Sequence, residues 1–168
     1  IYFKQRNIKL KNIKLLTSDD LDLVNSFINN NINDFKNFIE LGWSLKNIKE
    51  HFLKKNNISL ICLHQNKVCG LLIGEKIQAN SNEFELEIHI IFVSKNIRRK
   101  NIGTKMLSFI EKNKRLLNIF KIFLEVSDKN SEAIKFYKKN NFFLFNFRHN
   151  YYREKNNKHD AICYLKNI

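Results

Sequence analysis

The sequence predicts an α/β domain of the α+β kind, in which about four helices flank a mixed central β-sheet. Several segments place apolar residues at helical spacing, and between them lie apolar or alternating runs of strand length. These segments follow the order helix, helix, three strands, helix, strand, helix, two strands, which describes a mixed sheet with helices packed on it. The 168 residues, 43% of them hydrophobic, are enough to bury one core. We therefore expect residues 1–168 to form a single domain.

The expected helices follow recognisable start signals. The first helix should begin after Thr17–Asp20, a segment that supplies capping residues and first-turn acids ahead of an apolar stripe. Ser44 should cap the second helix. The third helix is expected over about 102–117 and the fourth over 131–139, because apolar residues recur there every three or four positions.

Six strands are expected, and the first two should form a hairpin. Gln65-Asn66-Lys67 separates those two strands and supplies the turn. The strands cover residues 58–64, 68–77, 83–93, 119–126, 142–147 and 160–165. No apolar run reaches the roughly 20 residues that a membrane-spanning helix needs, so no membrane contact is expected.

The chain is strongly basic, with a net charge of +14, which favours anionic partners. The lysines and arginines are dispersed and form no long basic block, so direct nucleic-acid binding is not expected. A polyphosphorylated cofactor or a ribosomal environment would also suit this charge, as would a simple lysine-rich solvated surface. His51, His64, His149 and His159 lack metal-ligand spacing, and no metal is expected.

The three cysteines are expected to be reduced thiols rather than disulfides or metal ligands. Cys62, Cys69 and Cys163 lack CxxC spacing, and apolar neighbours surround them. Reduced thiols suit a cytoplasmic location. The chain begins at Ile1 rather than at Met, so an upstream targeting segment stays an open alternative.

A basic segment lies between an expected strand and an expected helix. It reads Arg98-Arg99-Lys100-Asn101-Ile102-Gly103-Thr104. Backbone N–H groups at a helix start, together with flanking cations, form an anion site that suits a pyrophosphate. By itself, a basic loop before a helix is weak evidence for such a site.

A second segment, residues 123–137, ends one strand and begins the next helix. Asn130 starts the helix and Tyr137 follows seven residues later, so both lie on one face with Ala133 and Ile134. This spacing resembles the pattern of the GNAT superfamily of acetyl-CoA-dependent N-acetyltransferases. Further matches, at Trp43-Ser44, Ile91–Val93, Leu124–Val126, Asn150–Tyr152 and His159–Ile162, are most similar to the ribosomal-protein-alanine N-acetyltransferases. The segment from Arg98 to Leu107 is also similar to NatE-type N-terminal acetyltransferases.

The resemblance implies a role for each matched residue. Glu125 would be the general base and Tyr137 the general acid. Acetyl-CoA would be bound by Ile91, Phe92, Val93, Arg99, Lys100, Asn101, Ile102, Gly103, Thr104 and Asn130. Trp43, Tyr151 and Tyr152 would contact the acceptor, which both similar families imply to be the α-amino group of a protein or peptide N-terminus, including that of a ribosomal protein.

One position departs from the family pattern, which has Gly-x-Gly where this chain has Asn101-Ile102-Gly103. Asparagine is the non-glycine residue that best tolerates a positive φ. Its side chain would still crowd the approach of a cofactor, so the substitution bears on cofactor affinity more than on cofactor identity.

Other interpretations of these residues stay open. In one alternative the base is Glu87 or His89, which share a strand face with Ile91, instead of Glu125. Without the resemblance, Glu125 would be an ion-paired strand residue and Tyr137 a core aromatic. The alternatives for the whole chain are a GNAT enzyme acting on a small amine, a GNAT domain that binds acetyl-CoA without catalysis, and a non-enzymatic nucleic-acid-binding domain.

Overall fold

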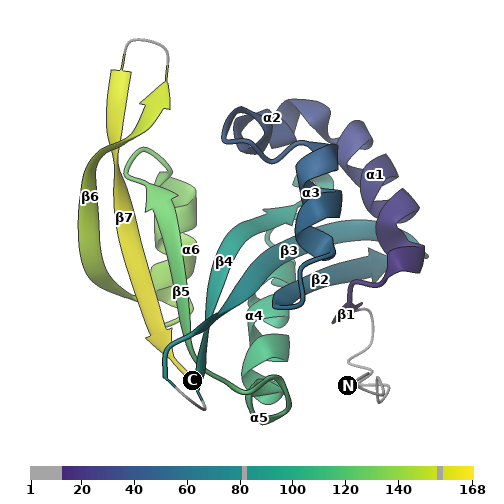
Figure 1. Cartoon of the computed structure of the whole chain (residues 1–168). Coiled ribbons are helices and arrows are strands. Elements are labelled where there is room, and N and C mark those ends of the chain that lie inside the picture. The colour runs from purple at the N-terminus through teal and green to yellow at the C-terminus, as the bar shows by residue number, and fades with distance from the viewer. Residues whose placement is uncertain (1–12, 81–82, 155–156) are drawn as a thin grey trace. The chain divides into compact units, whose positions relative to one another are not determined.

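The computed structural model describes residues 13–80, 83–154 and 157–168. These residues form six α-helices and a seven-stranded sheet of order β1-β2-β3-β4-β5-β7-β6 (Figure 1). The expected mixed sheet with flanking helices is therefore confirmed. The chain divides into two compact units, which are described separately below, and the expected single domain over residues 1–168 stays a prediction.

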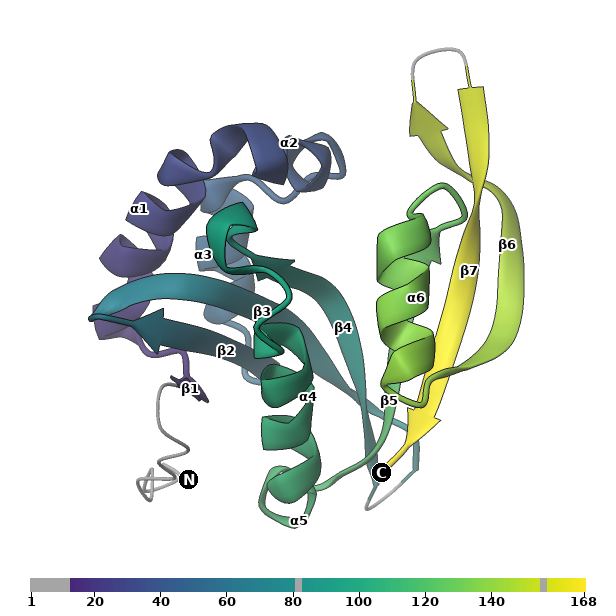
Figure 2. The same cartoon turned by 180° about the vertical axis from the view of Figure 1, so that it is seen from behind.

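The first unit comprises the described residues up to Ile73 together with Ile90–Phe109. Helices α1, α2 and α3 lie on one face of its strands and α4 on the other (Figures 1 and 2). Its elements are β1 (Ile13–Leu15), α1 (Leu21–Asn30), α2 (Ile32–Glu40), α3 (Leu45–Phe52), β2 (Asn57–His64), the first part of β3 (Lys67–Gln78), the last part of β4 (Phe84–Val93) and most of α4 (Ile102–Lys112).

Aromatic rings join the helices of this unit to its strands. The Phe92 ring lies 5.6 Å from that of Phe27 in α1 and 5.1 Å from that of Phe35 in α2. All three side chains are buried, together with aliphatic residues such as Ile61 and Leu71. This packing fixes the end of β4, where the basic segment begins.

Local signals in the sequence explain the ends of several elements. The Ser44 hydroxyl accepts a hydrogen bond from the Asn47 N–H at 3.3 Å and caps α3 as expected. Gln65 and Asn66 both have positive φ, as a two-residue hairpin turn requires. The expected hairpin of β2 and β3 is therefore confirmed.

The second unit comprises Gly74–His89 and Ile110–Ile168. Its elements are the remaining parts of β3, β4 and α4, then α5 (Lys114–Leu117), β5 (Ile119–Ser127), α6 (Ser131–Lys139), β6 (Phe143–Glu154) and β7 (Asn157–Asn167). Strand β7 pairs antiparallel with both β5 and β6. Strand β5 pairs parallel with β4 from Phe84 to Ile88.

Some elements differ from those predicted. Strand β1 and helix α2 were not predicted. Strand β1 is only three residues long, and α2 follows the polar run Asn29–Asn31 directly, although its Phe35, Phe38 and Ile39 recur at helical spacing and pack on the core. The expected helix over 102–117 is interrupted at Asn113. Strands β6 and β7 are longer than expected. Among the described residues, no helix combines the length and apolar character of a membrane span.

Candidate active site

The first group of predicted site residues lies at the end of β4, in the first unit. The Phe92 side chain is buried in the core, whereas Ile91 and Val93 are half-buried on the opposite face of the strand. The ladder that joins β4 to β5 ends at Ile88, opposite Leu124, while β4 itself continues to Val93. The last residues of β4 thus lie beyond this ladder.

The basic segment that follows has an unusual backbone. Arg99 has φ 65° and Asn101 has φ 58°, which places both in the left-handed region. Asn101 therefore adopts the conformation for which the family pattern uses glycine. Its carbonyl accepts a hydrogen bond from the Lys105 N–H at 2.9 Å, in the first turn of α4. The side chains of Arg99, Lys100 and Asn101 are exposed.

Arg98, the first residue of the segment, and Gly70, which the sequence did not assign to the site, both bear on its position. The Arg98 Nε donates a hydrogen bond to the Val93 carbonyl at 3.0 Å, and its guanidinium lies 5.9 Å from the centre of the Phe92 ring. Gly70 lies in β3, where an added Cβ would lie 3.1 Å from Ile102 and 3.3 Å from Met106. A glycine inside a strand often marks such a close approach, and this signal could have identified Gly70.

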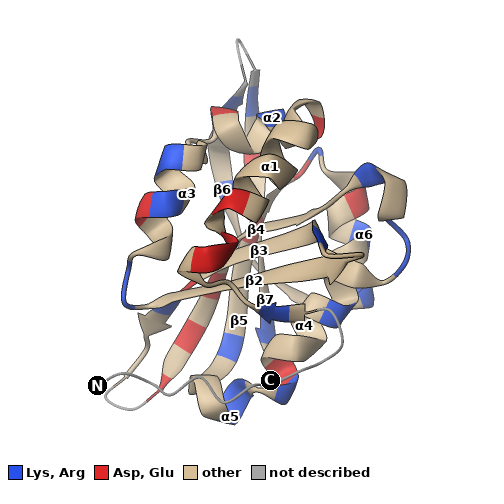
Figure 3. Cartoon of the chain, turned by 90° about the vertical axis from the view of Figure 1, so that its right-hand side faces the viewer, with Lys and Arg blue, Asp and Glu red and all other residues tan. Residues whose placement is uncertain are grey.

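The start of α4 is suited to an anion. Its first turn carries no acidic residue, and the exposed Arg99 and Lys100 precede it. Backbone N–H groups at a helix start attract negative charge. Across the described residues as a whole, the lysines and arginines are spread over several elements, among them α3, α5 and α6 (Figure 3). The segment is thus distinguished by its backbone rather than by a large basic patch.

Glu125 lies in the second unit, on the half-buried face of β5. One of its carboxylate oxygens accepts a hydrogen bond from Arg148 Nη1 at 2.7 Å. The same oxygen lies 3.8 Å from the Cys163 thiol. Only 14% of the Glu125 side chain is exposed, against 49% of Arg148. The predicted base is therefore already paired with a cation, as the alternative interpretation of Glu125 expected, and the sequence did not suggest that Arg148 is the partner.

A bulge in β6 places the two predicted acceptor tyrosines beside this pair. Arg148 pairs with Ala161 and Tyr152 with His159, so three residues of β6 lie opposite Asp160. The Asp160 carboxylate accepts a hydrogen bond from the Asn150 N–H at 2.8 Å and lies 2.9 Å from His149 Nδ1. Bulges commonly redirect side chains near functional sites.

The tyrosines of the bulge contact each other and the Arg148 guanidinium. The guanidinium lies 3.9 Å from the centre of the Tyr151 ring, and the Tyr151 and Tyr152 rings are 5.1 Å apart. Burial, and secondarily the Glu125 charge, raise the pKa of both phenols, that of Tyr152 to about 12. Both hydroxyls are therefore protonated at neutral pH and can donate hydrogen bonds.

The predicted acid, Tyr137, lies in α6 among other aromatic rings. Its ring lies 5.6 Å from that of Phe142 and 6.0 Å from that of Tyr164. Its side chain is buried, and this burial, with a smaller contribution from Tyr152, raises the pKa of the phenol well above its usual range. Asn130 caps α6, since its side chain accepts a hydrogen bond from the Ala133 N–H at 3.1 Å.

The alternative bases, Glu87 and His89, lie in the second unit, and the predicted acceptor residue Trp43 lies in the first. His89 lies 3.8 Å from the Glu87 carboxylate and 3.9 Å from that of Glu75, all in the second unit. Trp43 belongs to the first unit, where its ring packs against His51 at 5.3 Å. Tyr151 is also influenced by the Glu87 charge, so Glu87 and Glu125 affect the same phenol.

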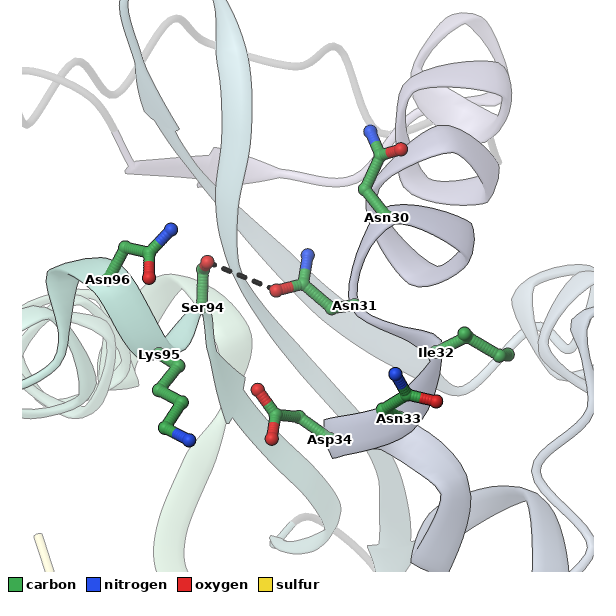
Figure 4. A pocket seen from close by; sticks show the side chains of 8 residues that line it. All are labelled: Asn30, Asn31, Ile32, Asn33, Asp34, Ser94, Lys95 and Asn96. Atoms are coloured by element: carbon green, nitrogen blue, oxygen red, sulfur yellow. Dashed lines mark hydrogen bonds between the residues drawn. The ribbon is translucent and has the colours of Figure 1, made fainter.

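The first unit also contains a polar pocket of about 360 Å³. It lies between the start of α2 and the segment after β4, and Ser94 donates a hydrogen bond to Asn31 across it at 3.1 Å (Figure 4). None of the predicted site residues lines it. The lining residues are Asn30, Asn31, Ile32, Asn33, Asp34, Ser94, Lys95 and Asn96.

Comparison with known families decides the class of the protein. Residues 27–142 match the family model described as the acetyltransferase (GNAT) family. This chain belongs to the GNAT acetyltransferase family. The resemblance found in the sequence is thereby confirmed. No curated protein matches this GNAT chain in sequence.

Solved structures similar to this GNAT chain include the ribosomal-protein-S18-alanine N-acetyltransferase from Escherichia coli. It is 20% identical with a TM-score of 0.71, and the match covers 93% of this chain and 92% of that one. The Arabidopsis thaliana NAA60 complex with acetyl-CoA is 13% identical with a TM-score of 0.73, covering 93% and 97%. A protein from Bacillus anthracis, assigned as a streptothricin acetyltransferase and solved with acetyl coenzyme A, is 25% identical with a TM-score of 0.62, covering 71% and 67%. The GNAT fold is therefore confirmed.

Proposed function

We propose that this GNAT acetyltransferase transfers the acetyl group of acetyl-CoA to the α-amino group of a protein N-terminus. One observation carries the proposal. The carboxylate of Glu125 lies on a strand face beside Tyr151 and Tyr152, which a bulge in β6 directs toward it. A base flanked by phenols that stay protonated suits a reaction in which an amine loses a proton.

The first unit contains residues that fit acetyl-CoA. The left-handed residues Arg99 and Asn101 precede the first turn of α4, and that turn carries no acidic side chain. We assign the pyrophosphate to the backbone of Arg99–Thr104, with the Arg99 and Lys100 side chains around it. The backbone of Ile91–Val93, beyond the ladder between β4 and β5, would bind the acetyl and pantetheine portion, and Asn130 would contact the same substrate.

The chemistry requires a neutral amine. An α-amino group has a pKa of about 7.7–8.0, so a large share is protonated at neutral pH. In the proposed reaction Glu125 removes one proton from this amine, directly or through a water molecule. The amine nitrogen forms a bond with the thioester carbonyl carbon, and the carbon–sulfur bond breaks to release the thiolate. Backbone N–H groups would stabilise the oxyanion that forms in between.

Tyr137 would assist the departing sulfur. Because burial raises the pKa of its phenol above the roughly 8.5 of a thiol, complete transfer of its proton to the thiolate is uphill. We therefore infer that Tyr137 mainly donates a hydrogen bond to the sulfur. Such assistance is smaller than that of a base acting on the attacking amine.

Two observations favour a protein acceptor over a small amine. One of the similar structures is an enzyme that acts on an alanine of ribosomal protein S18. The positive charge of this chain, +14, would also slow the encounter with a polyamine, because like charges repel over long distances. A small amine such as an amino sugar stays the alternative acceptor.

The test is an acceptor panel assayed with acetyl-CoA and read by mass spectrometry. The panel contains peptides with free N-termini, the same peptides with blocked N-termini and one free lysine, spermidine, and glucosamine phosphate. We expect acetylation of the free N-termini above all others. Acetylation confined to a small amine would reassign the acceptor, and calorimetric binding of acetyl-CoA without any product would indicate a non-catalytic domain.

A further inference from the structure

Arg148 was not among the predicted site residues, yet it contacts the proposed base directly. Its Nη1 donates a hydrogen bond to Glu125 at 2.7 Å, and the Tyr151 ring covers one face of its guanidinium at 3.9 Å. Two contacts from different strands therefore fix the position of this cation. The hydrogen bond to Glu125 also raises the pKa of Arg148, so the residue keeps its charge at every pH at which the enzyme would work.

The guanidinium has more donors than this arrangement uses. An arginine carries five N–H donors in a planar fork, and two parallel donors on one edge suit a carboxylate. Within residues 13–80, 83–154 and 157–168, Glu125 is the hydrogen-bonding partner of Arg148. About half of the Arg148 side chain is exposed, at 49%. A solvent-facing edge of the fork is thus available beside the proposed base.

We propose that Arg148 selects acceptors that carry a carboxylate next to the reacting amine, on the first or second residue of the N-terminal peptide. This inference rests on the proposed function, and it names the acceptor class as acidic N-termini. One edge of the guanidinium stays on Glu125 while the other binds the acceptor carboxylate. Arg148 is then a specificity-determining residue, and Glu125 keeps its role as base.

The distances agree with a carboxylate close to the amine. The amine must reach Glu125, and the Glu125 oxygen lies 2.7 Å from Arg148. Consecutive Cα atoms are about 3.8 Å apart. When the amine lies at Glu125, a carboxylate on the first or second residue can therefore reach the other edge of the Arg148 guanidinium. An acidic residue further along the peptide lies several residue lengths away and should have little effect.

The same cation disfavours a basic side chain at these positions. A lysine or arginine next to the amine would bring like charges together beside Arg148, and such juxtapositions are used to exclude wrong partners. The groups that act on the Arg148 guanidinium are Glu125, Tyr151 and Cys163. Glu125 is occupied by Arg148, and Arg148 is the cation of this group, about half exposed to solvent.

The experiment compares peptides that are identical except for the residue at position one or two. Peptides with Asp, Asn or Lys at position one, and at position two, are assayed with the wild-type protein, Arg148→Gln and Arg148→Glu. For the wild type we expect kcat/KM for the Asp peptides to exceed that for the Asn peptides by about fivefold, as a half-exposed ion pair allows, mainly through KM. Arg148→Gln should bring the ratio close to one, and Arg148→Glu should favour Lys over Asp.

The matched control is Arg153→Gln, which removes an exposed arginine from the same strand and should keep the wild-type ratio. An aspartate at position one also alters the basicity of the amine itself. The ratio in Arg148→Gln measures that effect separately. A wild-type ratio near one, or a ratio unchanged in Arg148→Gln while its thermal stability falls, would make Arg148 a structural ion pair and overturn the inference.

Failure of the proposed function gives a different result. In that case no peptide is acetylated by the wild type, whatever its charge, and the inference is overturned with it. Acetylation of Asp and Asn peptides at equal rates overturns the inference alone. Calorimetric titration of acetyl-CoA into each variant verifies that the variants are folded and bind the first substrate.

Discussion

In the segment between β4 and α4, the functional features are backbone features. Arg99 and Asn101 have positive φ, and the Arg98 side chain fixes the segment to the Val93 carbonyl. The face around Glu125 is built differently, from side chains of three strands that contact one another. Glu125, Arg148 and Cys163 are far apart in the sequence and come together through strand pairing.

This difference suggests how the two regions would respond to substitution. A site made of backbone groups tolerates a change of side chain if the conformation is kept, whereas a site made of contacting side chains does not. We therefore expect changes near Glu125 to affect turnover and changes near Asn101 to affect the binding of acetyl-CoA. The predictions below test this division, beginning with the largest effect.

Glu125→Gln should lower kcat by about a hundredfold or more, the usual contribution of a general base. The amide keeps a hydrogen-bond acceptor for Arg148 but cannot take a proton from the amine. The affinity for acetyl-CoA, measured by calorimetry, should stay within about threefold of the wild type, because the residue contacts the acceptor side. Glu85→Gln, a change in a half-buried pair with Lys121, serves as the control.

The opposite outcome would move the base to β4. If Glu125→Gln retained wild-type turnover while Glu87→Gln or His89→Ala lost it, the base would be one of those residues. Both lie in the second unit, and Glu87 influences Tyr151 as Glu125 does. The division between the two regions would survive that result, but the assignment of Glu125 would not.

Replacing Arg99 and Lys100 together with Glu should have the complementary effect. We expect acetyl-CoA binding to weaken by about tenfold or more, since charge-assisted hydrogen bonds to a phosphate are lost. The remaining affinity should depend less on salt, because attraction between opposite charges is screened by ions. Calorimetry at several salt concentrations measures both effects. Unchanged affinity would remove the pyrophosphate from this segment.

A matched control changes the same charge elsewhere. Lys138 and Lys139 are exposed at the end of α6, and their replacement by Glu alters the net charge by the same amount. This variant should bind acetyl-CoA with an affinity within about threefold of the wild type, since exposed charges that make no direct contact with the ligand are largely screened. An equal loss in both variants would mean that net charge alone attracts the ligand.

Much of the fold could be predicted from the sequence because its signals are local. Ser44 caps α3, the Gln65-Asn66 turn joins β2 to β3, and α6 covers the expected residues 131–139. Helix α2 was missed because it follows the polar run Asn29–Asn31 directly, and the contacts of Phe35 and Phe38 with Phe92 that fix it to the core join residues far apart in the sequence. The expected helix over 102–117 is interrupted at Asn113, between α4 and α5, where no proline or glycine in the sequence signals a break.

The residues of the candidate site also differ in whether the sequence alone could identify them. The segment of residues 98–104 is contiguous, so its residue types could be read directly, and a left-handed asparagine is a local preference. Arg148 could not be assigned in this way, because its contact with Glu125 depends on the register of β5, β7 and β6 and on a bulge. The Asp160 contacts that stabilise this bulge join residues ten or more positions apart in the chain.

Tyr137→Phe should lower turnover by a smaller factor than Glu125→Gln. The variant removes the hydroxyl and keeps the ring that packs on Phe142 and Tyr164. A thiol has a pKa of about 8.5, so the thiolate is a tolerable leaving group and we expect a loss of roughly tenfold. The deficit should shrink as the pH is raised. Unchanged turnover and an unchanged pH–rate profile would return Tyr137 to a purely structural role.

The stability of the protein at high pH provides an independent test of the buried phenols. The ordinary pKa of tyrosine is 10.0. Burial raises the pKa of Tyr152 to about 12 and raises the pKa of Tyr137 well above the ordinary value. Above pH 10 the unfolded chain loses these protons while the folded chain keeps them. The free energy of unfolding should therefore fall as the pH rises above 10. In chemical denaturation, Tyr137→Phe should show a shallower fall than the wild type, and an identical slope would contradict the burial of the hydroxyl.

Asn101→Gly should have the smallest effect, and it tests the backbone argument most directly. The residue has φ 58°, which glycine adopts without steric cost. If the segment acts through its backbone, acetyl-CoA affinity should stay within about threefold of the wild type, because the greater freedom of the unbound loop offsets the easier approach. Asn101→Ala is the informative partner, since a left-handed conformation costs an ordinary residue roughly 1–2 kcal/mol. Its affinity should fall by up to about tenfold. Equal losses in the glycine and alanine variants would instead show that the Asn101 amide itself contacts the ligand, and the segment would then resemble the side-chain network around Glu125.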